Sequence, residues 1–242
     1  MRYLGEVFVA LCGFVLRPWK LRWKDCALAF ERASFDALPV VSGIGFLLGL
    51  ILAFQSAAAL RMFGVEVYVA DLLAIGLFRE LGPIVTAIVL AGRSGSAFAA
   101  EIGTMKVDEE LDALSTMGLS PVGFLAVPRI LAATAAMPVL TVFAELAGLA
   151  GGALVLELLG VPVAAFWRHV VSSAGAFAIA FGLAKATLFG FLVAIVGCGA
   201  GISTRNTSDG VGVAATSAVV GGIVAIAVSD GILAVLCWIW NL

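Results

Sequence analysis

The stretch that decides the fold spans residues 79–118 and reads RELGPIVTAIVLAGRSGSAFAAEIGTMKVDEELDALSTMG. It opens with the adjacent charges Arg79 and Glu80, which lie between the apolar runs DLLAIGLF and LGPIVTAIVLA. Charges inside a bilayer cost free energy, so their presence in an apolar span indicates a structural or functional need. Small residues follow, and the stretch ends in an acidic segment. It therefore predicts a membrane span that leads into a helix exposed to water.

Composition supports a membrane location for the whole chain. Of its 242 residues, 62% are hydrophobic and 12% are charged, and the mean hydropathy is +1.15. Soluble domains have about half apolar and about a quarter charged residues. The net charge of -2 excludes a nucleic-acid-binding protein in any simple electrostatic sense. The sequence thus predicts an all-α integral membrane protein.

The cysteines have neither CxxC nor metal-ligand spacing, and His169 is the only histidine. We therefore expect buried free thiols and no metal site. The four cysteines are Cys12, Cys26, Cys198 and Cys237.

Residues 1–37 are predicted to form an amphipathic helical region in the membrane interface. Tryptophan and basic residues suit the headgroup level of a bilayer. Glu6 and the short apolar run argue against a first span, and Glu6 with the lack of an A-x-A-like site argues against a cleaved signal peptide. The expected apolar stripe contains Leu4, Val7, Leu11, Phe14 and Val15, and the basic and aromatic cluster contains Arg17, Pro18, Trp19, Lys20, Arg22, Trp23 and Lys24.

Residues 38–242 are predicted to form a domain of five transmembrane helices. Each apolar segment is near or above the roughly 20 residues that cross a bilayer. Gly45 and Gly49 have the spacing that brings two helices close together, although this spacing also arises by chance in a glycine-rich chain. The expected spans are residues 39–60, 66–92, 128–156, 171–201 and 211–240.

The distribution of Lys and Arg predicts the orientation. With the N-terminus in the cytoplasm, only Arg61 and Arg168 among the connecting residues lie outside, whereas most basic residues lie inside. Five crossings then place the C-terminus, including Trp238 and Trp240, on the periplasmic side.

A cytoplasmic amphipathic helix is expected at about residues 104–118. Val107, Leu111 and Leu114 recur on one helical face. The helix could rest on lipid headgroups, but anionic headgroups would repel its carboxylates, so docking on a protein partner is favoured. The carboxylates are Asp108, Glu109, Glu110 and Asp112, and Gly118 and Pro121 end the helix.

Ionisable residues inside the expected spans form a second group of candidates. Because such residues are costly in hydrocarbon, we expect them to pair or to line a cavity. Counting about 1.5 Å per residue places Glu80 and Lys185 at similar depth, although Lys185 could also meet Asp230. A static structural pairing and a functional role in which the charges change partners remain equally open. The group contains Arg79, Glu80, Glu145, Lys185 and Asp230.

Two sequence patterns bear on possible catalysis by this chain. No GxxxxGK[ST] motif is present, so ATP-driven work requires another chain. Residues 92–95 read GRSG, which matches the GxSG motif of rhomboid-type intramembrane serine proteases. A serine nucleophile needs a base within hydrogen-bond reach. In the expected topology His169 lies across the membrane from Ser94, about 30 Å away, so a protease is a minor alternative.

The stretch ELGPIVTAIVLAGRSGSAFAAEIGTMKV, followed by Asp112, Ala113, Leu114 and Gly118, resembles the MlaE-type (YrbE-type) permeases. These are membrane subunits of bacterial ABC lipid transporters. Residues 210–220, GVGVAATSAVV, also resemble a family pattern, although Ala215 replaces its first Thr. Composition alone would have predicted only a polytopic membrane protein with a docking helix.

The resemblance implies a bacterial inner-membrane permease that works as a homodimer with two ATP-binding subunits. ATP would bind those subunits, and this chain would hold no cofactor. Phospholipid would be the substrate, an MCE-domain protein the periplasmic partner, and outer-membrane lipid asymmetry the role. Export of another hydrophobic solute is the alternative.

The resemblance also assigns residues to three sites. It implies an intramembrane charge cluster of Arg79, Glu80, Lys185 and Asp230. The implied signature loop contains Gly92, Arg93, Gly95, Glu101 and Gly103. The implied coupling helix to the ATPase contains Lys106, Val107, Asp108, Glu109, Glu110, Leu111, Asp112 and Leu114.

Overall fold

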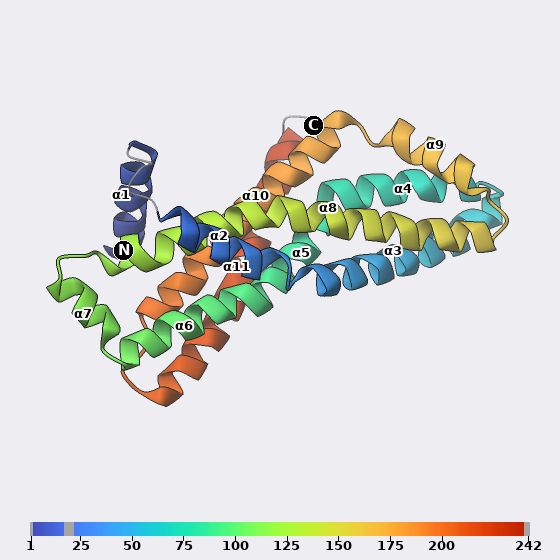
Figure 1. Ribbon diagram of the computed structural model, residues 1–242. Helices are drawn as coiled ribbons and strands as arrows, with labels where there is room; N and C mark the ends of the chain where they lie inside the picture. The colour runs from blue at the N-terminus through green and yellow to red at the C-terminus, as the bar shows by residue number, and fades with distance from the viewer. Residues whose placement is uncertain (1, 17–21, 240–242) are drawn as a thin grey trace. The chain divides into compact units, whose positions relative to one another are not determined.

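The computed structural model describes residues 2–16 and 22–239, and within these ranges it contains helices and short connections but no β-strand (Figure 1). Five helical stretches are long and apolar enough to cross a membrane, and a shorter apolar helix precedes them. The all-α fold class with five spans is therefore confirmed. Several residues of the expected interfacial clusters, namely Arg17, Pro18, Trp19, Lys20 and Trp240, lie outside the described ranges.

The chain divides into two compact units, which are described separately below. The first unit contains Met1–Asp36, Ala87–Met137 and Leu188–Leu242, and the second contains Ala37–Thr86 and Pro138–Thr187. The divisions fall inside three helices, which therefore contribute residues to both units. These helices are α5 (Gly82–Leu90), α8 (Val127–Leu158) and α10 (Ala176–Ile202).

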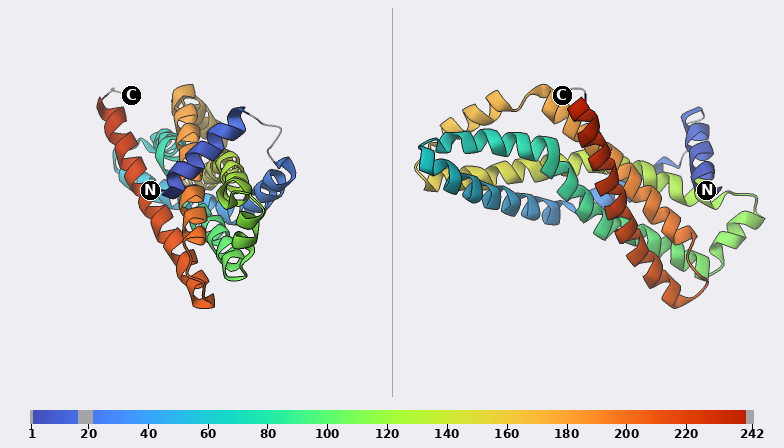
Figure 2. Two further views of the ribbon diagram at one scale, coloured as in Figure 1. Left: turned by 90° about the vertical axis from the view of Figure 1, so that its left-hand side faces the viewer. Right: turned by 180° about the vertical axis from the view of Figure 1, so that it is seen from behind.

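In the first unit, α6 packs along α11, as the two views of Figure 2 also show. Glycines let α10 come close to α6, because a Cβ atom at Gly201 would lie 2.9 Å from the carbonyl oxygen of Ala99. The helical segments complete within this unit are α1 (Arg2–Leu16), α2 (Trp23–Ser34), η5 (Ala91–Gly95), α6 (Ser96–Val107), α7 (Glu110–Thr116), η6 (Val122–Ala126) and α11 (Ser208–Ile239).

The N-terminal region forms two helices, α1 and α2, where one interfacial helical region was expected. One face of α1 packs on protein: Val7 is buried, and the Tyr3 hydroxyl donates a 3.1 Å hydrogen bond to the carbonyl of Ile195. Burial raises the pKa of the Tyr3 hydroxyl, which keeps it protonated as a donor. The other face exposes Leu4 and Phe8. The hydrophobic stripe was visible in the sequence, but the protein surface that covers part of it was not.

In the second unit, α3 (Leu38–Leu60) presents a buried row of small residues to α8. A Cβ atom at Gly45 would lie 2.9 Å from the Cα of Ala144, and one at Gly49 would lie 2.7 Å from the Cα of Gly148. The close helix contact expected from the Gly45 and Gly49 spacing is therefore confirmed. The buried row repeats every four residues and consists of Val41, Gly45, Gly49, Ala53 and Ala57.

The second unit continues from α3 through short 3-10 segments into the second span. These segments are η2 (Arg61–Phe63) and η3 (Glu66–Tyr68), followed by α4 (Val69–Gly76) and the π-helical segment η4 (Leu77–Leu81). The unit also contains α9 (Val163–Ser173), which packs against α4.

Two predicted boundaries differ from the structure. The second span continues as helix through Val107, well beyond the expected end at residue 92. The resulting stretch Glu66–Val107 has 42 residues, about twice the length that crosses a bilayer. The fourth span begins at Ala176 because the chain leaves helical geometry after α9, around Ala174 and Gly175. Hydropathy alone did not reveal this break, because both sides of it are apolar.

The segment predicted as one helix over residues 104–118 is two helices, α6 and α7. Glu109 has a φ angle of 62°, in the left-handed region, and it separates the two helices. Left-handed geometry is uncommon for residues other than glycine, so the sequence contained no clear sign of this turn.

Candidate functional site

The η4 segment has π-helical hydrogen bonding, and Pro83 explains why. Proline has no backbone N–H, so the carbonyl of Arg79 lacks its usual α-helical donor four residues ahead. The N–H of Gly82 instead donates to the carbonyl of Leu77, five residues back. Single π-helical turns inside α-helices occur frequently at functional sites. This segment carries Arg79 and Glu80.

Helix α10 approaches η4 closely enough to bring a cation to Glu80. Gly182 lies against the carbonyl of Phe78, where any side chain would collide with the backbone. One helical turn beyond Gly182, the Lys185 ammonium donates a hydrogen bond to Oε2 of Glu80. The Lys185 side chain is 1% exposed, whereas that of Glu80 is 39% exposed. The expected proximity of Glu80 and Lys185 is therefore found in the structure.

An aromatic ring belongs to the same cluster. The Phe181 ring centroid lies 5.9 Å from Cζ of Arg79 and 5.9 Å from Nζ of Lys185. Arg79 Nε lies 4.0 Å from Oε1 of Glu80. An aromatic face attracts cations within about 6 Å, more strongly where water is excluded. Phe181 was not identified from the sequence as part of this cluster. Its position four residues before Lys185 places both residues on one helical face.

Glu145 also approaches this segment. Its side chain is buried, and a Cβ atom at Gly82 would lie 2.9 Å from Oε1 of Glu145. The resemblance alone had given no support to this residue. Asp230 lies in α11, in the first unit, and is partly buried.

His169 takes part in a polar contact between α4 and α9. Its Nδ1 lies 3.2 Å from each carboxylate oxygen of Asp71, and the Ser173 hydroxyl donates a 2.5 Å hydrogen bond to Oδ1 of Asp71. Tyr68 packs edge-on against the imidazole. These contacts give His169, the only histidine of the sequence, a structural role: it helps to hold α9 against α4. Ser94, the candidate nucleophile, is helical and 4% exposed.

The residues predicted as a signature loop are helical instead. Gly92, Arg93 and Gly95 lie in η5, and Glu101 and Gly103 lie in α6. Helix packing explains two of the glycines: a Cβ atom at Gly95 would lie 3.1 Å from Cγ1 of Val193, and one at Gly103 would lie 2.9 Å from Oγ1 of Thr204. The small residues therefore allow close helix contacts, and no loop is needed.

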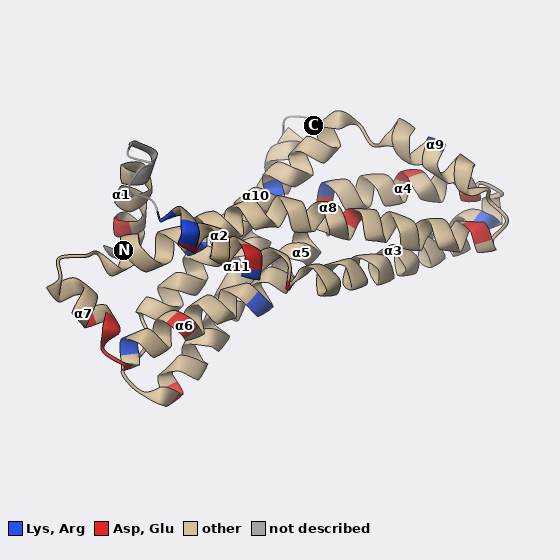
Figure 3. Cartoon of the chain, viewed as in Figure 1, with Lys and Arg blue, Asp and Glu red and all other residues tan. Residues whose placement is uncertain are grey.

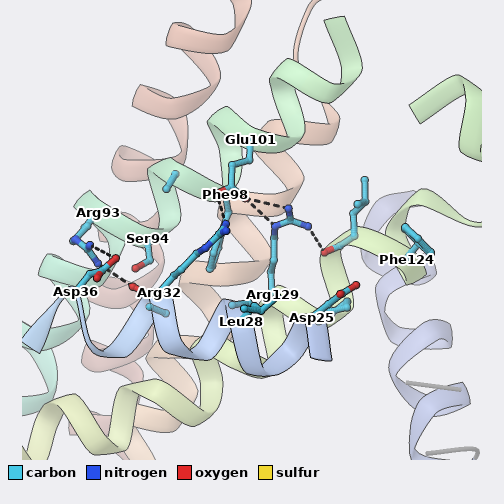
Figure 4. Close-up of a pocket in the computed structure, with 15 residues that line it drawn as sticks. Asp25, Leu28, Arg32, Asp36, Arg93, Ser94, Phe98, Glu101, Phe124 and Arg129 are labelled. Atoms are coloured by element: carbon cyan, nitrogen blue, oxygen red, sulfur yellow. Dashed lines mark hydrogen bonds and ion pairs between the residues drawn. The ribbon is translucent and has the colours of Figure 1, made fainter. Parts of the chain in front are cut away.

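The charged members of this group connect α6 to α2 and α8. Arg93 Nη2 lies 3.2 Å from Oδ2 of Asp36. Arg129 Nη2 lies 3.1 Å from Oε2 of Glu101, and Arg32 Nη1 lies 4.0 Å from Oε1 of Glu101. These side chains surround a pocket of about 390 Å³ that is lined by residues of α2 and the turn after it, and of η5, α6, η6 and α8 (Figure 4).

The predicted coupling segment is organised differently from the expectation. Leu111 and Leu114 are buried, so the apolar stripe faces this chain's own interior instead of a partner. Lys106 donates a 2.7 Å hydrogen bond to the carbonyl of Ile202 and so caps the end of α10. Val107 is partly buried at the end of α6. The carboxylates of this segment are exposed and gather around the turn between α6 and α7 (Figure 3): Asp108, Glu109, Glu110 and Asp112.

Five long apolar helices, with an ion pair inside them, define a polytopic helical membrane protein. The family model described as Permease MlaE matches residues 28–236, and the chain belongs to this family of ABC transporter permeases. It is thus a multi-pass inner-membrane protein.

Individual relatives agree with this assignment. The chain is 36% identical to a probable ABC transporter permease protein of Rickettsia typhi, over 92% of this chain and 86% of the relative. It is also 36% identical to the intermembrane phospholipid transport system permease protein MlaE of Haemophilus influenzae, over 90% of this chain and 85% of the relative. The chloroplastic protein TRIGALACTOSYLDIACYLGLYCEROL 1 of Arabidopsis thaliana is 32% identical over 88% of this chain and 61% of the relative.

Proposed function

We propose that this ABC transporter permease moves phospholipid between the inner membrane and a periplasmic carrier. The observation that supports a transport role most directly is the Glu80–Lys185 pair in a π-helical segment of an apolar span. The similarity to a relative named for intermembrane phospholipid transport supports the choice of substrate. Export of another hydrophobic solute is the competing function.

The proposed assembly contains two copies of this chain and two ATP-binding subunits. ATP binds and is hydrolysed on those subunits, and this chain contributes no cofactor. The exposed carboxylates at the turn between α6 and α7 are the proposed contact with the ATPase. An MCE-domain protein is the proposed periplasmic partner, and maintenance of outer-membrane lipid asymmetry is the proposed role.

The charge cluster can contribute without covalent chemistry. Lys185 is enclosed, whereas Glu80 is partly exposed, so Glu80 is the member that can leave the pair and meet a polar group. A polar lipid headgroup passing through a hydrocarbon environment needs such groups, because unpaired charge there is costly. Exchange of partners by Glu80 would thus accompany passage of the headgroup.

The proposed orientation places the N-terminus in the cytoplasm and the C-terminus in the periplasm. Reporter fusions after Asp112 should report a cytoplasmic location, and fusions after Leu242 should report a periplasmic one. A cytoplasmic C-terminus would contradict the proposed topology.

The substrate is tested by purifying the chain with its partner subunits and identifying bound lipids by mass spectrometry. The complex is then reconstituted, and ATP-dependent transfer of labelled phospholipid to the periplasmic carrier is measured. We expect phospholipid to co-purify and to be transferred only with ATP. Co-purification of a different hydrophobic solute, with no ATP-dependent phospholipid transfer, would support the alternative.

A further inference from the structure

The pocket between α2, α6 and α8 contains charged groups that the proposed transport role does not use. All of its lining residues belong to the first unit. Its cavity of about 390 Å³ is near the lower end of the range for small-molecule sites, roughly 300–1,000 Å³. Three arginines and three carboxylates line it, so their formal charges cancel: Arg32, Arg93, Arg129, Asp25, Asp36 and Glu101.

The three arginines differ in how closely their guanidinium groups approach a carboxylate. Arg93 and Arg129 each have a carboxylate oxygen within 3.2 Å. The only ion pair of Arg32 among the described residues is the 4.0 Å contact with Glu101, and its side chain is 73% exposed. Figure 4 shows Arg32 and Arg129 reaching the same carboxylate, Glu101. Arg32 therefore has guanidinium donors available to another oxygen-bearing anion.

Apolar residues line part of this pocket and lie along the helix beside it. Phe98 and Leu125 form buried apolar parts of its wall. On α2, Trp23 and Leu28 are 64% and 53% exposed, and Phe35, directly after this helix, is 67% exposed. Tryptophan and exposed apolar residues beside basic groups are typical of a helix at the headgroup level of a membrane. A ligand with a polar head and apolar chains matches both parts of this surface.

We infer that this pocket binds the phosphodiester of a membrane phospholipid headgroup, with Arg32 as its principal ligand. The planar guanidinium presents paired N–H donors that match phosphate oxygens. The carboxylates in the pocket disfavour ligands with high negative charge and favour a headgroup that also carries an ammonium group. The pocket volume fits a headgroup, and the acyl chains extend over the exposed apolar face of α2.

This inference goes beyond the proposed function, because it concerns a lipid held at the α2 surface and not the molecule that is transported. It depends on the membrane location of the chain and on the pocket residues alone. Failure of phospholipid transport would leave it unaffected. Failure of lipid binding at Arg32 would likewise leave the transport proposal unaffected.

The test uses the full chain purified in detergent and native mass spectrometry with three added probes. They are dioleoylphosphatidylethanolamine, dioleoylglycerol and inorganic phosphate. The chain is compared with Arg32→Gln and with the matched control Arg205→Gln, which removes an exposed arginine of the same unit outside the pocket. We expect Arg32→Gln to weaken phosphatidylethanolamine binding about tenfold. We expect Arg205→Gln to leave this binding unchanged and dioleoylglycerol binding to be equal in all three proteins.

A second variant tests the sign of the electrostatic effect. Glu101→Gln removes the carboxylate shared by Arg32 and Arg129, so it should strengthen phosphatidylethanolamine binding. Because the Arg32 side chain is mostly exposed, Arg32→Gln should retain the thermal unfolding temperature of the unmodified chain.

Three results would overturn the inference. Equal weakening by Arg32→Gln and Arg205→Gln would indicate general surface attraction. Equal binding of dioleoylglycerol and phosphatidylethanolamine would indicate apolar contact alone. Inorganic phosphate that displaces the phospholipid at comparable concentration would indicate a site for a free anion.

Discussion

The two units contain similar ion pairs whose cations differ in burial. In the second unit, Lys185 is 1% exposed and donates to Glu80 inside an apolar span. In the first unit, Arg129 is 19% exposed and Glu101 is 43% exposed where they meet, and Arg32 is 73% exposed. Removing one partner of a buried pair leaves the other charge buried without its partner. When one partner of an exposed pair is removed, water solvates the charge that remains. Burial, and not the number of ion pairs, should therefore decide which charges the fold depends on.

The largest stability effect is expected from Glu80→Ala, because it removes the carboxylate hydrogen-bonded to the enclosed Lys185 ammonium. Loss of one buried partner costs about 3–5 kcal/mol, whereas loss of both can be nearly neutral. Thermal unfolding in detergent should show a large loss for Glu80→Ala and substantial recovery in the double variant Glu80→Ala/Lys185→Ala. Additive losses would contradict energetic pairing.

The same double variant separates the two roles of the charge cluster. If the pair serves stability alone, ATP-dependent lipid transfer should recover together with the unfolding temperature. If Glu80 exchanges partners during transport, stability should recover while transfer remains defective. Parallel measurements on one reconstituted sample distinguish these results.

A smaller effect is expected from Gly49→Ala, which tests the tight packing of α3 against α8 in the second unit. The added methyl group would meet the backbone of Gly148, and overpacking of this kind costs about 1–3 kcal/mol. Gly43→Ala is the matched control in α3, because its Cβ atom would have no neighbour within 4 Å. It should stabilise the helix by about 0.5–1 kcal/mol. Equal unfolding temperatures for the two variants would contradict close packing at Gly49.

Arg129→Gln should cost still less, although it breaks the contact with Glu101. The Arg129 side chain is 19% exposed and that of Glu101 is 43% exposed, so water reaches the pair. Ion pairs that water reaches contribute about 0.2–1 kcal/mol, and salt weakens them. The unfolding temperature should therefore fall only slightly, and added salt should narrow the difference from the unmodified chain. A loss as large as that of Glu80→Ala would show that exposure does not separate the two regions.

The smallest stability effect is expected from reversing Asp108, Glu109 and Glu110 to Lys, because all three are exposed. The same change should release the proposed ATPase partner during purification, since the three carboxylates form much of the proposed contact. Glu157→Lys, at an exposed position of α8, is the control for charge reversal elsewhere. Unchanged co-purification of the ATPase would assign the acidic turn another role.

The sequence was most informative where one physical requirement dominated. The need for long apolar segments predicted the five spans. The cost of intramembrane charge marked five residues, and helix depth made Glu80 one of two possible partners of Lys185. Backbone details were harder to predict: a left-handed Glu109 divides the expected docking helix, and the break near Gly175 lies between two apolar segments. Pro83 was visible, but its π-helical consequence depends on the hydrogen bonds that neighbouring residues then adopt.

Contacts between distant segments could not be predicted in the same way. Leu111 and Leu114 form a recognisable apolar stripe, but the sequence does not say whether this chain or a partner covers it. The charged pocket around Arg32 joins residues from α2, α6 and α8 that are far apart along the chain. The resemblance identified Arg93 and Glu101 as notable without indicating that they connect these helices.

The row of small residues on α3 also restricts how this sequence can diverge over evolutionary time. A Cβ atom at position 49 would collide with the backbone of Gly148. A larger residue at position 49 is therefore tolerated only together with a second change that moves the backbone near Gly148 away. Single substitutions there should be purged, and accepted changes should occur as correlated pairs between α3 and α8. Exposed positions of α3 such as Ile44 and Ile51 face no such restriction and should exchange freely among apolar residues.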